Sequence, residues 1–258
     1  MANNIHPTAI IADKDVKIGE NVTIGPYTIV EDNVEIGDGV DIASHVQIGR
    51  GARIHKNARI FIGAVVSGRP QDLKYADEDT LTVIGENTTI REYVTIHRGT
   101  EDKWQTTIGN NCLIMAYTHV AHDCIIGDHV ILSNACNMAG HVTIQEYAII
   151  GGMVPIHQFV TIGRHSFIGG GFRVSKDVPP YIRASNSPLT YNGLNAVGLR
   201  RRGYTSETVA QIKEAYHLIY RSKLNVSQAV LAIKQDLPQT EEIGHILEFI
   251  ENSARGII

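Results

Sequence analysis

Residues 111–158 read NCLIMAYTHVAHDCIIGDHVILSNACNMAGHVTIQEYAIIGGMVPIHQ, and an apolar residue returns at every sixth position, from Ile114 to Ile156. The same phase runs from Ile18 to Val174. The only breaks are Asp72, Glu78 and Asp102, which lie in polar stretches. A period of six fits neither an α-helix nor a flat strand. It predicts a parallel β-helix, in which short strands alternate with turns and successive coils stack on one another.

Two polar stretches interrupt the repeat without changing its phase, as loops leaving a corner would. They predict excursions near residues 67–83 and 98–107, and loops on a rigid scaffold are where binding residues concentrate. Pro179 and Pro180 then end the strand pattern, and helical periodicity follows in 207–221, 227–236 and 241–252. We therefore expect a β-helix over residues 1–190 and a small α-helical domain over 191–258.

Composition excludes several classes of protein. A net charge of −4 argues against nucleic acid as the main partner. No apolar run approaches the roughly 20 residues of a membrane span, and the N-terminus has no signal pattern, so we expect a cytoplasmic protein without membrane insertion. Cys112, Cys124 and Cys136 all fall at a small inward position of the repeat, which predicts buried thiols in a reducing compartment.

Histidines are numerous, with 12 in the chain. If a coil holds three hexads, residues eighteen apart stack at one corner, about 4.8 Å apart along the rod. One extra hexad in the second excursion would bring His97 into the same register. The corner would then gather His97, His122, Gly140, His141, His157 and Gln158.

The cluster fits acid–base chemistry or a metal site. Asp123 follows His122, and a carboxylate bonded to one ring nitrogen fixes the tautomer and raises the basicity of the other. Gly140 would let a substrate approach closely and offer its N–H to an oxyanion. Carbonic anhydrases that share such a rod bind zinc, but they typically pair histidines five residues apart, whereas the close pair here, His119 and His122, is three apart. We expect no metal and no cofactor.

The repeat resembles that of the hexapeptide-repeat acyltransferases, and several motifs make the resemblance specific. These are His119-Val120-Ala121-His122-Asp123-Cys124, Ala139-Gly140-His141, His157-Gln158-Phe159, Gln71-Asp72-Leu73-Lys74-Tyr75, Ile96-His97-Arg98-Gly99 and Arg200-Arg201-Arg202-Gly203. They look like the acyl-carrier-protein:UDP-N-acetylglucosamine O-acyltransferase family, over nearly the whole chain. The resemblance implies a left-handed, triangular rod and a cytoplasmic homotrimer with active sites between subunits.

The resemblance also implies roles for individual residues. His122 would be the general base on the glucosamine 3-hydroxyl, Asp123 its orienting partner and Gly140 the oxyanion donor. The sugar, hydroxyl and acyl groups would meet Gln71, Asp72 and Lys74, and the cleft would be lined by His97, His119, His141, His157 and Gln158. The uridine diphosphate would be held by Asn195, Arg201 and Arg202. Val197 departs from the family, which often has glutamate there.

The implied reaction is direct transfer of a 3-hydroxyacyl chain from acyl carrier protein to UDP-N-acetylglucosamine, the first step of lipid A biosynthesis. One alternative is the UDP-glucosamine N-acyltransferase of the same pathway, whose family carries an extra N-terminal domain. Two others are a zinc-dependent, carbonic-anhydrase-like hydratase and a purely structural solenoid, which does not account for the clustered histidines.

Two further expectations concern the acyl donor. Gly170 lies 48 residues after His122, which is about 13 Å along the rod, so it is expected to leave room for the far end of an acyl chain in a groove between subunits. A basic rim for the acidic carrier is expected late in the rod. Its residues would be Arg164, Arg173, Arg183 and Arg200.

Overall fold

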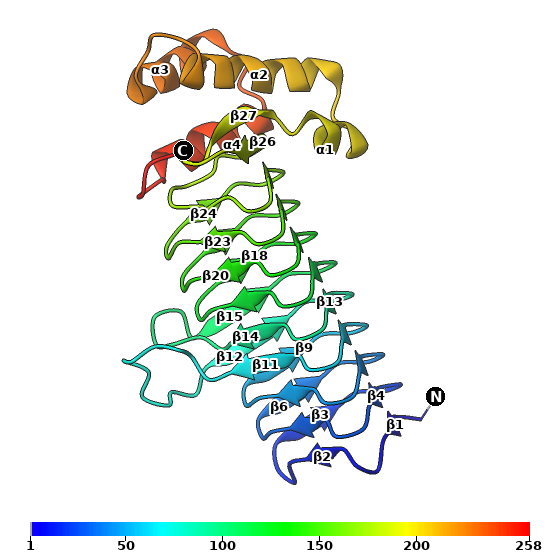
Figure 1. Ribbon diagram of the computed structural model, residues 1–258. Coiled ribbons are helices and arrows are strands. Elements are labelled where there is room, and N and C mark those ends of the chain that lie inside the picture. The colour runs from blue at the N-terminus through cyan, green and yellow to red at the C-terminus, as the bar shows by residue number, and fades with distance from the viewer. Residues whose placement is uncertain (1) are drawn as a thin grey trace.

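The protein is a long three-sided rod of short strands with a helical cap at one end (Figure 1). The structure, a computed structural model, describes residues 2–258. Three sheets run along the rod, and each coil contributes one strand to each sheet in turn. Within the rod all pairings are parallel, as the period of six predicts.

The three sheets are named here by the order in which the chain meets them. Sheet 1 contains β1 (Asn4–Ile5), β4 (Thr23–Ile24), β7 (Asp41–Ile42), β10 (Arg59–Ile60), β13 (Thr89–Ile90), β16 (Leu113–Ile114), β19 (Ile131–Leu132), β22 (Ile149–Ile150), β25 (Phe167–Ile168), β26 (Ile182–Ser185) and β27 (Thr190–Leu194). Sheet 2 contains β2 (Ile10–Ile11), β5 (Ile29–Val30), β8 (Gln47–Ile48), β11 (Val65–Gly68), β14 (Thr95–His97), β17 (His119–Val120), β20 (Asn137–Met138) and β23 (Pro155–Ile156). Sheet 3 contains β3 (Val16–Ile18), β6 (Val34–Ile36), β9 (Ala52–Ile54), β12 (Leu81–Ile84), β15 (Gln105–Ile108), β18 (Ile125–Ile126), β21 (Thr143–Ile144) and β24 (Thr161–Ile162).

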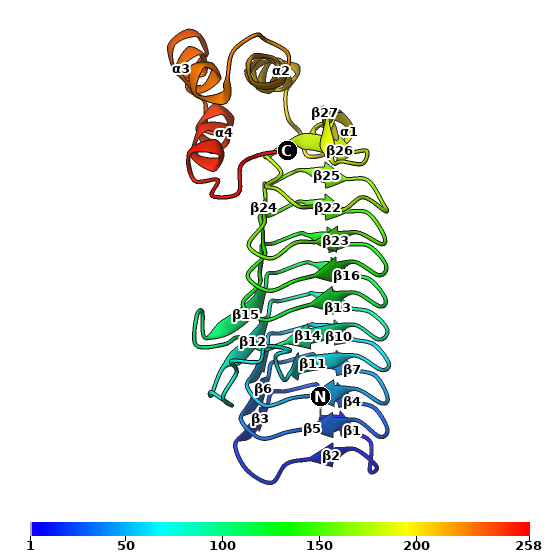
Figure 2. The same cartoon turned by 60° about the vertical axis from the view of Figure 1, so that its left-hand side comes forward.

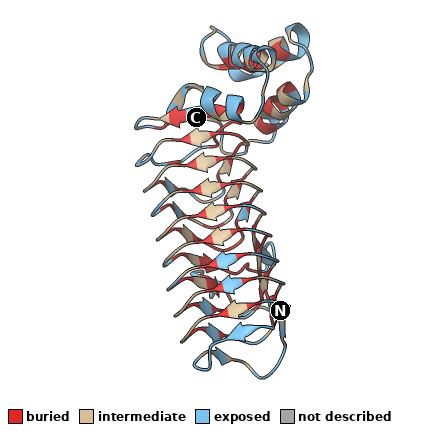
Figure 3. Ribbon diagram, turned by 90° about the vertical axis from the view of Figure 1, so that its right-hand side faces the viewer, coloured by how far each residue is buried: buried red, intermediate tan, exposed pale blue. Residues whose placement is uncertain are grey.

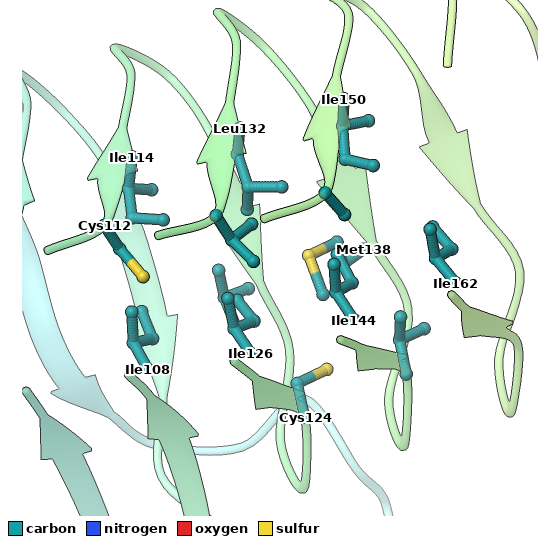
Figure 4. Packing of buried hydrophobic residues seen from close by; sticks show 14 of the residues in the cluster. Ile108, Cys112, Ile114, Cys124, Ile126, Leu132, Met138, Ile144, Ile150 and Ile162 are labelled. Atoms are coloured by element: carbon teal, nitrogen blue, oxygen red, sulfur yellow. The ribbon is translucent and has the colours of Figure 1, made fainter. Parts of the chain in front are cut away.

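The interior is a column of stacked aliphatic side chains (Figure 4), and buried residues recur in the coils along the rod (Figure 3). Ile108, Ile126, Ile144 and Ile162 pair in register and are at most 1% exposed. Full burial of an isoleucine contributes roughly 1.5–3 kcal/mol, so the column gives the rod much of its stability. The three cysteines are buried and free, as predicted, and burial raises the pKa of the Cys124 thiol to about 12.

Sharp corners separate the strands. Asp123, His141 and Phe159 lie eighteen residues apart at one corner, and all have positive φ, between 59° and 64°. This left-handed conformation is unusual for residues other than glycine, and Asn, Asp and His adopt it more readily than most. The tight turn allows side chains of adjacent residues, such as 122 and 123, to point the same way.

Both excursions leave the rod at the corner between sheet 2 and sheet 3 (Figures 1 and 2). The first joins β11 to β12 and the second joins β14 to β15. Arg59 pairs with Thr89, an offset of 30 instead of 18, so the first adds 12 residues to its coil. Thr95 pairs with His119, an offset of 24, so the second adds six. The predicted extra hexad, which puts His97 in register with residue 121, is confirmed.

The rod ends in a hairpin and four helices. Strand β26 extends sheet 1 and pairs antiparallel with β27. The helices are α1 (Ala196–Arg201), α2 (Ser206–Tyr220), α3 (Val226–Asp236) and α4 (Glu241–Glu251). The predicted helical segments are thus confirmed to within one residue at each end, and Thr205, Asn225 and Thr240 cap three of them. The division at residue 190 stays a prediction. No helix in residues 2–258 is both long and apolar enough to cross a membrane.

Candidate active site

The predicted site residues gather where five successive coils meet the corner between sheets 2 and 3. The first two coils contribute the excursions, and the next three contribute residues 121–124, 139–142 and 157–160. The corner is hollowed into a cleft of about 940 Å³. Its lining includes Gln71, Asp72, Lys74, His122, His141 and Gln158. Residues far apart in the sequence therefore share one cleft, as the coil register predicts.

His122 and Asp123 form a hydrogen-bonded pair at this corner. His122 Nδ1 donates to Asp123 Oδ2 at 2.7 Å. Asp123 is fully buried and also accepts hydrogen bonds from Thr100 N (2.9 Å), Thr100 Oγ1 (2.7 Å) and Lys103 N (3.3 Å). Burial by itself raises the pKa of Asp123, but the bonds from His122 and Thr100 outweigh it and lower the pKa to about 2. A fixed carboxylate anion thus holds one nitrogen of His122 and leaves Nε2 free.

Gly140 lies directly against the ring of His122. A Cβ on Gly140 would come within 2.7 Å of His122 Cε1 and 2.9 Å of Nε2, closer than real Cβ contacts allow. Any side chain here would push the imidazole out of place, which accounts for glycine at this position. The Gly140 N–H donates to no backbone acceptor in residues 2–258.

The histidines of the predicted cluster separate into two pairs and one outlier. The rings of His122 and His141 lie 5.1 Å apart at 90°, and those of His97 and His119 lie 4.7 Å apart. Burial, helped by the neighbouring His119, lowers the pKa of His97 to about 4, and burial also lowers the pKa of His119. His157 is exposed, with Nδ1 3.1 Å from the Gln158 carbonyl oxygen, and contributes nothing to the cleft of its own chain.

The three residues expected to hold the diphosphate lie on a different corner, between sheets 3 and 1. The guanidinium of Arg202 lies 4.9 Å from the centre of the Tyr147 ring. Asn195 caps α1 through Gly198 N and donates Nδ2 to the His165 carbonyl oxygen at 2.9 Å. Arg201 is exposed on α1. None of the three lines the cleft of His122, so one chain does not bring the two sets together.

Comparison with known proteins identifies the family. Residues 177–258 match the family model described as Udp N-acetylglucosamine O-acyltransferase, domain 2, and residues 15–50 and 105–140 match the bacterial transferase hexapeptide model. The chain is 58% identical over 251 residues to the acyl-[acyl-carrier-protein]--UDP-N-acetylglucosamine O-acyltransferase of Aquifex aeolicus, covering 97% of this chain and 96% of the relative. The chain belongs to this O-acyltransferase family.

Other members of the O-acyltransferase family agree in sequence and structure. The Sulfurihydrogenibium sp. enzyme of the same name is 56% identical over 254 residues, which is 98% of this chain and 93% of the relative. The solved structure of LpxA from Acinetobacter baumannii is 44% identical, with a TM-score of 0.95 over 98% of this chain and 99% of that chain. The predicted fold class, a left-handed parallel β-helix followed by a small helical region, is confirmed, and so is the prediction of an acyltransferase.

Two buried residues that support the O-acyltransferase cleft were missed by the sequence analysis. Arg98, only 8% exposed, donates from Nε to Tyr75 Oη at 2.8 Å and from Nη1 to the Ser67 carbonyl oxygen at 3.2 Å. It therefore ties the start and the middle of the first excursion to the rod. Thr100 holds Asp123, as described above. Arg98 belongs to the motif Ile96-His97-Arg98-Gly99 noted from the sequence and Thr100 directly follows it, but the period of six gives no information on loop contacts.

Gly170 lies at the corner between sheets 1 and 2, across sheet 2 from His122. Its φ is not positive, whereas Gly171 has φ +77°, so Gly171 is the residue that the turn requires to be glycine. A Cβ on Gly170 would lie 3.1 Å from the Gly152 carbonyl oxygen. Backbone conformation therefore does not require glycine at position 170, whereas the close approach to the Gly152 backbone disfavours a Cβ there.

Proposed function

We propose that this O-acyltransferase transfers a 3-hydroxyacyl chain from acyl carrier protein to the 3-hydroxyl of UDP-N-acetylglucosamine, the first step of lipid A biosynthesis, with His122 as general base. The observation that carries the assignment is the His122–Asp123 pair with a free Nε2 facing a large polar cleft, beside an unpaired N–H at Gly140. Relatives across the whole chain carry this activity in their names.

Each step of the transfer has a residue to perform it. His122 Nε2 takes the hydroxyl proton as the hydroxyl oxygen attacks the thioester carbonyl, forming the new C–O bond. The Gly140 N–H donates to the developing oxyanion. The C–S bond then breaks, and the proton held by His122 passes to the leaving thiolate. Asp123, anionic because its pKa is about 2, stabilises the imidazolium between these steps.

No covalent intermediate is needed. The cysteine thiols point into the core, and burial raises the pKa of Cys112 to about 11 and that of Cys124 to about 12, so neither supplies a thiolate at neutral pH. The residues assigned to hold the sugar and acyl groups are Gln71, Asp72, Lys74, His141 and Gln158. His97 and His119, which the sequence also placed in the cleft, lie on the neighbouring strands β14 and β17 and are not among its lining residues.

The site is completed by a second copy of the chain in this proposal. Asn195, Arg201 and Arg202 lie on one corner and His122 on another, separated by sheet 3. Guanidinium groups pair bidentately with phosphate oxygens, which suits Arg201 and Arg202 for the diphosphate. A closed homotrimer would bring these groups of one subunit to the cleft of the next. His157, exposed in the single chain, would then also face the neighbour.

Turnover by the purified chain tests the proposed function. We expect 3-hydroxyacyl carrier protein and UDP-N-acetylglucosamine to give an acylated sugar nucleotide, with or without a metal chelator. The zinc alternative rests on His122, Asp123 and His141, whose ligand atoms lie within 4.8 Å of one another. The four hydrogen bonds already made to Asp123 favour acid–base chemistry instead. Absence of product, or activity abolished by the chelator, would contradict the proposal.

Enlarging Gly170 is expected to shorten the preferred acyl chain. Gly170→Met places a side chain in the groove that this proposal assigns to the far end of the acyl chain. Each methylene that loses its buried place forfeits roughly 0.8 kcal/mol, so excluding two methylenes changes discrimination by about tenfold. Relative turnover on donors of graded length measures the change. Gly170→Ala is the control, because it adds the same Cβ contact with Gly152 without filling the groove. An unchanged length profile in folded Gly170→Met would rule out a role for Gly170 in setting the preferred acyl length.

The carrier is expected to bind a basic rim near the end of the rod. Arg164 is not part of it, because it is half-buried, lies 3.1 Å from Glu146 and contacts His245. Arg173, Arg183 and Arg200 are exposed there.

Arg173→Glu and Arg183→Glu should each raise the KM for the acidic carrier at low salt, and the difference should shrink as salt screens the charges. Lys14→Glu, the same change at the opposite end of the rod, should leave that KM unaltered. Equal KM values for all three variants at low salt would place the carrier elsewhere.

A further inference from the structure

The second excursion supplies a carboxylate to the other histidine of the cleft. Asp102 Oδ2 lies 3.0 Å from His141 Nδ1, although the two residues are two coils apart. The contact meets the distance of a hydrogen bond but not its angle. His141 Nδ1 is buried and has no other hydrogen-bond partner in residues 2–258. The Asp102 side chain is 60% exposed, so it has room to turn into line.

His141 is otherwise fixed in orientation. Its ring stacks on Phe159 with centroids 4.7 Å apart, which sets the plane of the imidazole. Its Nε2 lies 3.9 Å from Asp123 Oδ2, and the ring stands at 90° to that of His122. Stacking does not determine which nitrogen carries the proton. A hydrogen-bond acceptor beside Nδ1 determines the tautomer, because it favours the proton on Nδ1. Nε2 of the neutral ring is then unprotonated.

The same excursion also holds the His122–Asp123 pair. Thr100 donates its N–H and its hydroxyl to Asp123, two residues before Asp102 in the chain. One short loop therefore contacts both histidine sites of the cleft. Thr100 bonds to the Asp123 carboxylate of the first, and Asp102 places its own carboxylate beside His141 in the second.

We propose that Asp102 is a positioning residue: its carboxylate accepts a hydrogen bond from His141 Nδ1 and presents His141 Nε2 in one tautomer to the His122–Asp123 pair and the bound substrate. The proposal rests on the proposed function, in which His141 lines the substrate cleft. Asp102 acts only through His141 and touches no reacting atom.

A double-mutant cycle tests this dependence. Asp102→Ala should lower kcat/KM by about tenfold, in the usual range of coupling between contacting residues. In a His141→Ala background the same change should have no further effect, because the residue it positions is gone. Asp102→Asn should retain most activity, since the amide oxygen still accepts from Nδ1. Glu101→Gln removes a neighbouring charge that also lines the cleft but lies within ion-pair distance of no histidine in residues 2–258, so it should lower kcat/KM less than Asp102→Ala does.

Two readouts separate positioning from loop folding. Trp104, the only tryptophan, lies on the same excursion, so its emission reports the state of the loop. The ¹⁵N shifts of His141 report its tautomer, which should become mixed in Asp102→Ala while the Trp104 emission stays constant. A loss that persists in the His141→Ala background, or that Glu101→Gln reproduces, would overturn the proposal. Wild-type protein without acyl transfer would instead contradict the proposed function, and the His141 shifts would still test the Asp102 contact.

Discussion

Replacing His122 with alanine is expected to lower kcat by about two to four decades, the usual contribution of a general base. Nε2 of His122 is the free nitrogen of the pair, and the fully buried Asp123 has no other imidazole within hydrogen-bond distance. The rod should stay folded, because its stability comes from inward-facing residues such as Ile126 and Leu132. The measurement is acyl transfer to UDP-N-acetylglucosamine at saturating substrates, with thermal unfolding recorded on the same sample.

His55→Ala provides the matched control, since His55 is an exposed histidine on a turn of the same rod, far from the cleft. It should keep full activity. Near-normal activity in folded His122→Ala would remove His122 from the role of base, and a similar loss in His55→Ala would mean that the assay reports damage to the rod.

Mixing two inactive variants is expected to restore activity if the active site lies between subunits. His122→Ala removes the base, and Arg202→Ala removes a guanidinium proposed to bind the diphosphate of the neighbouring site. In a cyclic trimer that contains both variants, one of the three clefts keeps His122 and also has a neighbour that keeps Arg202, so about a third of the sites are complete. Activity should rise from near zero to about a third of the wild-type value.

The control mixture pairs His122→Ala with Asp72→Ala. Both residues line the cleft of one chain, so each cleft in the mixture lacks one or the other. This mixture should stay inactive. Differently tagged chains purified through both tags ensure that only mixed oligomers are assayed. Recovery with Asp72→Ala, or none with Arg202→Ala, would contradict the arrangement between subunits.

Much of the rod could be predicted because the coil repeat fixes both register and orientation. The spacing of eighteen places Gly140 beside His122, and the single extra hexad after His97 follows from the unbroken phase. The inward direction of Cys124 follows in the same way. These inferences needed only the period and the size of side chains.

The contacts made by the excursions could not be predicted, because a loop has no period. Asp102 appeared only as a break in the apolar series, and nothing in the sequence connects it with His141, 39 residues later. Thr100 and Arg98 were missed for the same reason. His157 shows the converse limit: register places it near the corner, but the direction of its side chain leaves it exposed in the single chain.

The position of the new bond is the most direct test of the account. Purified protein would receive 3-hydroxyacyl carrier protein together with two acceptors, UDP-N-acetylglucosamine and a UDP-sugar with a free amine. We predict an ester on the glucosamine 3-hydroxyl, identified by NMR and by its cleavage in mild base, and no acylated enzyme when the donor is supplied alone. An amide as the main product would support the N-acyltransferase alternative, and a stable acyl-enzyme would contradict direct transfer with His122 as the base.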